Sequence, residues 1–163
     1  MLDEQPAPAV VRAVEKLAPG TALDLACGTG RHAIYLAQRG WRVMALDRSP
    51  GAIAALNKQA SGLELETRVV DLEDDRFTIQ PGRYDLILAW LYRQLALFPK
   101  IRDGVCPGGI AACSVLKKGR FAAKPGELNA TFGGWHVLYS LENERTAEMV
   151  AKKPSDCNRH AMK

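Results

Sequence analysis

The chain has 163 residues, of which 47% are hydrophobic and 25% are charged, the balance of an ordinary globular domain. This length is one domain's worth, and it leaves no room for a separate substrate-binding domain. The net charge of +4 arises within residues 117–163, which carry nine basic and five acidic groups with little aromatic interleaving. That pattern favours a solvated basic surface over a nucleic-acid site, so we expect no nucleic-acid partner.

The apolar runs and the cysteines indicate the cellular location of the chain. The longest apolar run is seven residues, Leu86 to Tyr92, far below the ~18 residues of a membrane span. The N-terminus lacks the basic-then-apolar order of a signal peptide. The cysteines form no Cys-x-x-Cys pair, and Cys157 with His160 offers too few ligands for structural zinc. We therefore predict no metal site and a reducing, cytoplasmic location.

Predicted helices and strands alternate along most of the chain. The hydrophobic periodicity and the turn residues predict strands over residues 21–26, 41–47, 65–71, 84–90 and 109–116. The same signals predict helices over residues 10–17, 31–39, 50–60, 94–102 and 125–132. Residues 73–82 are acidic and then rich in Pro and Gly, so a loop is expected where this alternation would place a helix.

Two further strands are predicted at the end of the chain, over residues 135–142 and 146–152. The connection around Asn143 is too short for a parallel crossover, so these strands must form an antiparallel hairpin. The predicted fold class is therefore α/β. It is a doubly wound, mostly parallel, seven-stranded, Rossmann-like sheet with a C-terminal antiparallel hairpin.

The strongest functional signal is the segment LDLACGTG, which joins the first predicted strand to the helix after it. Its glycines, Gly28 and Gly30, let a ligand approach the backbone closely, and the helix start beyond them suits an anion. Carboxylates lie within or at the ends of the first three strands: Asp24, Asp47 and Asp71. Because parallel strands point their carboxyl ends into one crevice, we expect these groups to lie around one ligand.

Two kinds of ligand fit this pattern. A nicotinamide dinucleotide would use the glycine loop for its pyrophosphate, but Asp24 lies four residues before Gly28, where a pyrophosphate comes close. Ala33 stands at the third position of the dinucleotide pattern and does not favour that ligand. A ligand with an ammonium, a ribose and an adenine matches the carboxylates better, and S-adenosylmethionine is such a ligand. A nicotinamide-dependent oxidoreductase remains an alternative.

The sequence resembles the class I S-adenosylmethionine-dependent methyltransferases. The first two motifs correspond to LDLACGTGRHAIYLAQRGWRVMALDRSPGAI, and the later ones to VVDLED, YDLILAW and CPGGIAACSVL. The order PGEL, then WHVLYSLE, then AEMVAKKP is similar to the small methyltransferases grouped with tellurite-resistance proteins. The resemblance implies one cofactor-binding methyltransferase domain over residues 1–163.

The resemblance also implies a set of cofactor contacts. At the methionine end of S-adenosylmethionine it places Asp24, Ala26, Gly28, Gly30 and Arg31. Around the adenosine it places Asp47 on the ribose hydroxyls, Arg48 against the adenine, Asp71 on the adenine amino group and the backbone of Leu72. On the sulfonium side it places Ala89 and Trp90. Ala26 stands where this family often carries glycine, and the missing helix before the fourth strand leaves one adenine wall undefined.

The acceptor is less well defined by the sequence. The fourth strand is followed by WLYRQ and not by the Asn/Asp-Pro-Pro-Tyr element that holds a planar amine of DNA or of a protein glutamine. Tyr92 and Arg93 are expected at the mouth of the crevice, where Arg93 would attract an anionic substrate. We predict a small acceptor (a thiol, oxyanion, metalloid anion or carboxylate) in an open cleft, and assign no catalytic base. An RNA methyltransferase and a non-catalytic cofactor-binding protein remain alternatives.

Overall fold

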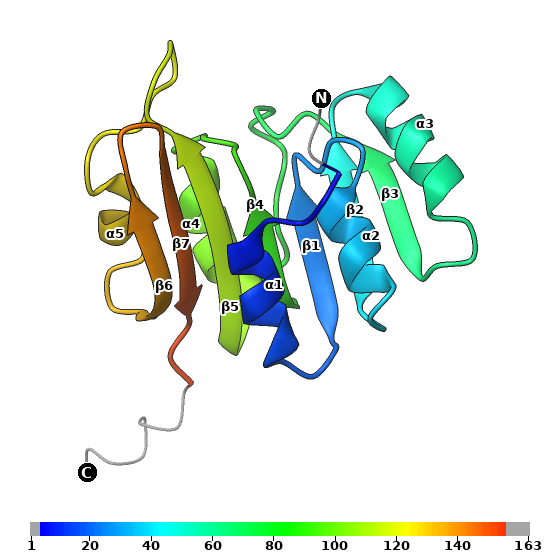
Figure 1. Cartoon of the computed structure of the whole chain (residues 1–163), viewed down its shortest axis with the longest axis horizontal. Coiled ribbons are helices and arrows are strands. Elements are labelled where there is room, and N and C mark those ends of the chain that lie inside the picture. The colour runs from blue at the N-terminus through cyan, green and yellow to red at the C-terminus, as the bar shows by residue number, and fades with distance from the viewer. Residues whose placement is uncertain (1–3, 156–163) are drawn as a thin grey trace.

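The computed structural model describes residues 4–155 and contains one seven-stranded sheet with five helices in that part of the chain (Figure 1). The strands are β1 (Thr21–Leu25), β2 (Arg42–Asp47), β3 (Leu65–Val69), β4 (Tyr84–Ala89), β5 (Val105–Leu116), β6 (His136–Glu142) and β7 (Thr146–Lys152). The helices are α1 (Pro8–Glu15), α2 (Arg31–Ala37), α3 (Pro50–Gln59), α4 (Leu97–Gly104) and α5 (Glu127–Thr131).

The strand order is β3-β2-β1-β4-β5-β7-β6. Strands β1 to β5 are parallel, whereas β7 pairs antiparallel with both β5 and β6. The predicted fold class is therefore confirmed, including the C-terminal hairpin. The order reverses between β1 and β4, and ligands of open α/β sheets bind outside the carboxyl ends of the strands at such a point.

Helices cover both faces of the sheet, α1, α2 and α3 on one and α4 and α5 on the other (Figure 1). Two apolar clusters fill the layers, and β4 supplies both because its residues alternate between faces. Leu86, Leu88 and Trp90 pack with α1 and α2, whereas Ile87 and Ala89 pack with α4. A strand buried on both faces explains why YDLILAW is almost wholly apolar.

The segment between β3 and β4, residues 70–83, contains no helix, as the sequence predicts. A helix at this place would cover the sheet with apolar side chains, and the segment does part of this itself. Leu72 and Ile79 are buried in the same apolar cluster as residues of α4. Phe77 packs against this cluster, and Lys100 of α4 donates to the Phe77 carbonyl at 2.6 Å. The loop is therefore an ordered cover for this face of the sheet.

Some boundaries differ from the prediction. The fourth predicted helix starts three residues later, at Leu97, and runs directly into β5 at Val105. Strand β5 includes the Pro107-Gly108-Gly109 turn predicted to precede it, with a register shift against β4 at this point. Cys157 and His160 lie outside the described residues. No helix within residues 4–155 is long and apolar enough to cross a membrane.

Candidate functional site

A cavity of about 740 Å³ lies across the carboxyl ends of the parallel strands. Its lining comes from the ends of, or the loops after, all five parallel strands: Ala26, Asp47, Arg48, Val70, Asp71, Leu72, Glu73, Leu91, Tyr92, Arg93, Leu116, Lys118, Gly119, Arg120 and Phe121. The structure thus brings together these sequence-predicted residues: Ala26, Asp47, Arg48, Asp71, Leu72, Tyr92 and Arg93. This volume is within the range of small-molecule and cofactor sites.

The glycine loop after β1 has the geometry that close ligand approach needs. Gly28 has φ +57°, and a Cβ built there would meet no atom within 4 Å, so the backbone faces open space. Gly30 has φ +90° and caps α2, and a Cβ there would collide with Leu56. Gly28 therefore leaves room for a ligand, whereas Gly30 is required for the packing of α2 against α3.

Asp47 joins the glycine loop to the end of β2. One carboxylate oxygen accepts a hydrogen bond from the Gly28 N–H at 2.9 Å, and the other accepts from the Ser49 N–H at 2.9 Å. Both bonds are charge-assisted, and they fix the half-buried carboxylate at the cavity wall. Each oxygen keeps a second lone pair, so Asp47 can still accept hydrogen bonds from a ligand's hydroxyl groups.

Asp24 is a buried titratable group near the end of β1, two residues before Ala26 of the cavity lining. Its side chain is buried, and Oδ2 has no hydrogen-bond partner among the described residues. Burial raises the pKa of this carboxyl to about 7, against the lowering effects of a hydrogen bond from the Ala33 backbone and of the Arg31 charge. A buried acceptor without a donor is costly, and such groups cluster at functional sites. A ligand ammonium would satisfy it.

Several predicted cofactor contacts are absent from the lining of this cavity: Asp24, Gly28, Gly30, Arg31, Ala89 and Trp90. The Arg31 guanidinium donates to the Gln5 carbonyl at 3.0 Å, which ties the N-terminal segment to the start of α2. The Trp90 ring packs edge-on against the ring of His32, with centroids 5.9 Å apart. His32 Nε2 in turn accepts a hydrogen bond from the Ala7 N–H. Its ring therefore links the N-terminal segment to Trp90.

Backbone strain is also concentrated at the cavity. Within residues 4–155, only two residues other than glycine have positive φ, Ala26 at +54° and Leu91 at +55°. Both line the cavity, one after β1 and the other after β4. Ala26 stands where the resemblance leads us to expect glycine. Glycine adopts positive φ more readily than alanine, so Ala26 holds a backbone conformation that favours glycine. A non-glycine residue in this region costs roughly 1–2 kcal/mol.

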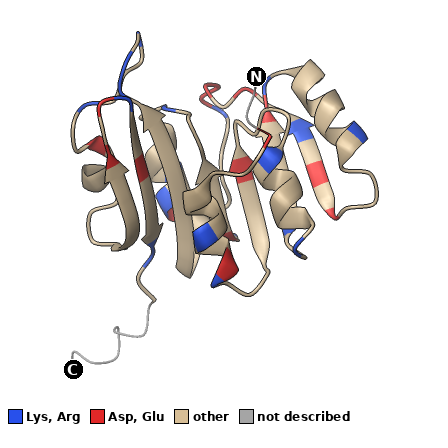
Figure 2. Cartoon of the chain, in the orientation of Figure 1, with Lys and Arg blue, Asp and Glu red and all other residues tan. Residues whose placement is uncertain are grey.

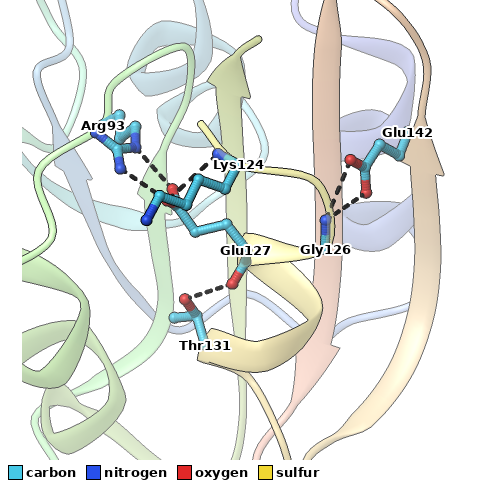
Figure 3. Close-up of polar contacts among 6 residues, drawn as sticks. All are labelled: Arg93, Lys124, Gly126, Glu127, Thr131 and Glu142. Carbon is cyan, nitrogen blue, oxygen red and sulfur yellow. Dashed lines mark hydrogen bonds and ion pairs between the residues drawn. The ribbon is translucent and has the colours of Figure 1, made fainter. Parts of the chain in front are cut away.

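Arg93 lines the cavity, but its charge is already paired. Its guanidinium makes a bidentate ion pair with Glu127 of α5, with both N···O distances at 2.7 Å (Figure 3). This pair lowers the pKa of the Glu127 carboxyl, so the pair stays ionised at neutral pH. Arg93 therefore braces the loop after β4 against α5. Its predicted attraction of an anionic substrate stays a prediction, with its charge neutralised by Glu127.

The cavity lining at the end of β5 and in the loop after it is missing from the residues predicted by sequence. It consists of Leu116, Lys118, Gly119, Arg120 and Phe121. The available signal is the run KKGRFAAK, which stands directly after the fifth strand and holds four of the nine basic residues of 117–163. Composition alone favours a solvated surface for this charge excess. Its position after a strand of the parallel sheet places it at the same edge as the carboxylates.

No metal centre is found in the described part of the chain, where no group of three or more His, Cys, Asp and Glu side chains could hold an ion. Cys27 lies in the glycine loop, half-buried, and its thiol pKa is raised by burial and by the charges of Asp24 and Asp47. A thiol with a raised pKa is a poor nucleophile at neutral pH.

Comparison with known proteins identifies the family. Residues 5–101 match the family model described as "Tellurite resistance protein TehB". The chain belongs to the TehB family. The probable S-adenosyl-L-methionine-dependent methyltransferase TehB of Haemophilus influenzae is 37% identical over 82 residues, which are 49% of this chain and 28% of that protein. Hemagglutinin 1 of Eikenella corrodens is 34% identical over 96 residues, which are 57% of this chain and 32% of that protein.

Solved structures agree with the TehB assignment at the level of the fold. The crystal structure of TehB from Haemophilus influenzae superposes with a TM-score of 0.82 at 22% sequence identity, covering 91% of this chain and 62% of that one. The Rossmann-like methyltransferase fold predicted from the sequence is thus confirmed. The chain spans about a third or less of the curated TehB and hemagglutinin relatives described above.

Proposed function

We propose that the chain binds S-adenosylmethionine in the cavity and transfers its methyl group to a small-molecule acceptor, acting as one domain over residues 1–163. The observation that carries the proposal is the pairing of the Asp47 carboxylate with the Gly28 N–H at 2.9 Å. It fixes a hydroxyl-accepting group beside a glycine that leaves the backbone open. Membership of the TehB family and the printed name of the Haemophilus influenzae relative support the same activity.

The residues present fit this cofactor. The unpartnered Oδ2 of Asp24 is a buried acceptor suited to the ammonium group. The free lone pairs of Asp47 suit the two ribose hydroxyls, and Asp71, at the cavity wall after β3, suits the adenine amino group. Arg48 and Leu72 line the cavity after the neighbouring strands β2 and β3, and there they would flank the adenine. When bound, the cofactor supplies an electrophilic methyl group on a positively charged sulfur.

The chain's own contribution is orientation and exclusion of water. Holding both reactants in line can supply ~7–11 kcal/mol of the barrier reduction. Leu91 and Tyr92 after β4, and Leu116 and Phe121 near the end of β5, give the acceptor side apolar walls. A general base is needed only for an acceptor that arrives protonated, and we assign none.

Acceptors compatible with an open cleft are a small thiol, an oxyanion, a metalloid anion or a carboxylate. Some relatives are named for an organic acceptor. One is the 2-heptyl-1-hydroxyquinolin-4(1H)-one methyltransferase of Mycobacteroides abscessus, which is 34% identical over 86 residues. This supports the view that the loops around a shared cofactor site determine which acceptor is methylated. The cytoplasmic location stays a prediction from the spacing of the cysteines.

Calorimetry tests the proposal directly. S-adenosylhomocysteine, the reaction product, should bind saturably to the full chain, and NADH should give no heat. Saturable binding of NADH without binding of S-adenosylhomocysteine would replace the proposal with a nicotinamide-dependent oxidoreductase. A panel of acceptors with a radiolabelled methyl donor then identifies the acceptor class. Steeply salt-dependent RNA binding with methyl incorporation into RNA would instead indicate an RNA methyltransferase.

A further inference from the structure

The cavity lining carries a net negative charge on one side, where Arg48 lies among Asp47, Asp71 and Glu73, and basic residues on the other. Asp71 and Glu73 line it after β3, and Lys118 and Arg120 line it after β5. Figure 2 shows this separation, with red on the loop beyond β3 and blue on the loop that rises beyond β5. The carboxylates lie on the side proposed for adenosine. The cations therefore lie on the side where the acceptor must enter.

Lys118 and Arg120 are the basic residues there whose charges stay available. Arg93 is paired with Glu127, and Lys117 is paired with Glu142 at 2.9 Å. Within residues 4–155, neither Lys118 nor Arg120 has a carboxylate within ion-pair distance. Arg120 lies only over the ring of Phe121, 5.6 Å from its centroid. Two cations facing a cavity without counter-charges favour an anionic ligand.

The loop that carries them, residues 117–126, is held firmly at both ends. The Lys117 N–H donates to the Arg145 carbonyl at 2.8 Å, and the Ala123 N–H donates to the Leu116 carbonyl at 2.9 Å. Farther along, the Gly126 N–H is held by the Glu142 carboxylate (Figure 3). The tip is thus positioned by the sheet edge and the hairpin.

Exposed apolar side chains line the same cavity as the cations. Leu91, Leu116 and Phe121 line the cavity with 47%, 49% and 71% of their surface exposed. Such a cluster of large apolar groups at a site mouth is suited to an apolar ligand body. The acceptor side therefore combines an anion-binding end with an apolar surface.

The chemistry of methyl transfer separates the anionic group from the reacting atom. The acceptor's nucleophilic atom forms a bond to the methyl carbon while the carbon–sulfur bond breaks and its electron pair passes to the sulfur. When the nucleophile is an anion, its charge and that of the sulfur cancel in this step. A cation bound to that atom would stabilise the ground state more than the transition state and slow the reaction. Lys118 and Arg120 are therefore better suited to a group that keeps its charge.

The sheet geometry gives the separation required. Strand β5 is two strands from β1, where the glycine loop would hold the methionine end, and adjacent strands are ~4.8 Å apart. The end of β5, where the loop with the cations starts, is therefore about 5–10 Å from the ends of β4 and β1. A separation of this size suits an aromatic carboxylate with a nucleophile on the far side of its ring better than it suits a small inorganic oxyanion.

We propose that Lys118 and Arg120 bind a permanently anionic group of the acceptor, remote from the atom that is methylated, and that Leu91, Leu116 and Phe121 contact its apolar body. This inference rests on the proposed function. The acceptor class is an amphipathic organic anion, such as an aromatic carboxylate with a separate thiol or hydroxyl group. Lys118, Arg120 and Phe121 then determine specificity.

The test uses 4-mercaptobenzoate and its neutral match 4-mercaptobenzamide, titrated by calorimetry into the full chain saturated with S-adenosylhomocysteine. The carboxylate should bind about tenfold or more tightly than the amide, the value of one charge-assisted contact. In the variant Lys118→Met/Arg120→Met this preference should fall to about threefold or less. The matched control Lys16→Met/Lys58→Met loses the same charge at exposed residues outside the cavity lining and should keep the preference.

Kinetics with S-adenosylmethionine supply a second readout. The double variant should raise the KM for 4-mercaptobenzoate about tenfold and leave kcat and the KM for the amide within about twofold. Equal binding of the two thiols, a preference that survives in the variant, or tighter binding of selenite than of the carboxylate would each overturn this inference and leave the proposed function standing. Failure of S-adenosylhomocysteine to bind at all would overturn both.

Discussion

Replacing Asp24 by Asn should change how the stability of the protein depends on pH. In the folded chain, burial raises the pKa of this carboxyl from 3.8 to about 7, whereas the unfolded chain titrates near the ordinary value. Between these pH values the folded state holds more protons than the unfolded state. The free energy of unfolding therefore falls as the pH rises from about 4 to about 7. At 1.36 kcal/mol per pH unit, the loss is on the order of 4 kcal/mol.

The Asp24→Asn substitution removes this titration and keeps the shape, so the stability difference between variant and wild type isolates it. Urea unfolding of both proteins, measured from pH 4 to pH 8 without ligand, should show Asp24→Asn gaining on the wild type by an amount on the order of 4 kcal/mol over that range. Other groups titrate equally in both proteins and cancel. Parallel stability curves would refute the reasoning, because they would mean that the buried carboxyl titrates normally.

Asp85→Asn is a control of opposite sign. Hydrogen bonds from the Thr21 N–H at 2.8 Å and hydroxyl at 3.0 Å hold the pKa of Asp85 below its ordinary value. Its contribution to stability is therefore present above the ordinary pKa and is lost as the pH falls through the lowered one. Relative to the wild type, Asp85→Asn should lose stability as the pH rises through the acid range, the reverse of Asp24→Asn.

Three further outcomes can be measured with the same preparations. Asp47→Asn should weaken S-adenosylhomocysteine binding by about 1–3 kcal/mol in calorimetry, because the amide nitrogen cannot accept hydrogen bonds; unchanged affinity would count against the pose. Gly30→Ala should lower the urea midpoint, with a loss of roughly 1–3 kcal/mol, because its Cβ would collide with Leu56; an unchanged midpoint would mean that α2 can shift freely. Arg93→Met should raise the pKa of Glu127 towards its ordinary value, seen by NMR titration, and a carboxyl that titrates unchanged would exclude the ion pair.

Most of the fold was predictable because its signals are local. Ser49 accepts from the Ala52 N–H at the start of α3, where Ser-Pro predicts a helix cap. Asn143 accepts from the Thr146 N–H in the hairpin turn that the short connection predicts. The start of β5 at Val105 was not predicted, because pairing with β4 across a register shift keeps a Pro-Gly-Gly segment in the sheet. Tertiary pairing overrides turn propensity there.

The candidate site was predictable on one side only. Asp47 and Asp71 follow strands, and the ends of parallel strands meet at one edge, so spacing alone places them together. The pairing of Arg93 with Glu127 joins residues 34 positions apart and depends on where α5 packs. The direction of Lys118 and Arg120 depends in the same way on the hairpin that anchors their loop. The neighbours of loop side chains are determined by tertiary packing, and the local sequence pattern carries no information about that packing.

The unpartnered buried carboxylate oxygen and the positive φ angles of the non-glycine residues occur in the same part of the molecule. Asp24 is buried without a partner for one oxygen, and Ala26 and Leu91 hold positive φ angles, at or just beyond the carboxyl ends of β1 and β4. Strained or unsatisfied groups persist where the surrounding structure enforces them, and they cluster at ligand sites. A ligand ammonium beside Asp24 would bind the ionised form, so S-adenosylhomocysteine affinity should rise between pH 6 and pH 8 in the wild type and stay flat in Asp24→Asn. The stability that burial of this carboxyl removes from the free protein would then be partly recovered on binding, and affinity and stability would respond to Asp24→Asn in opposite directions.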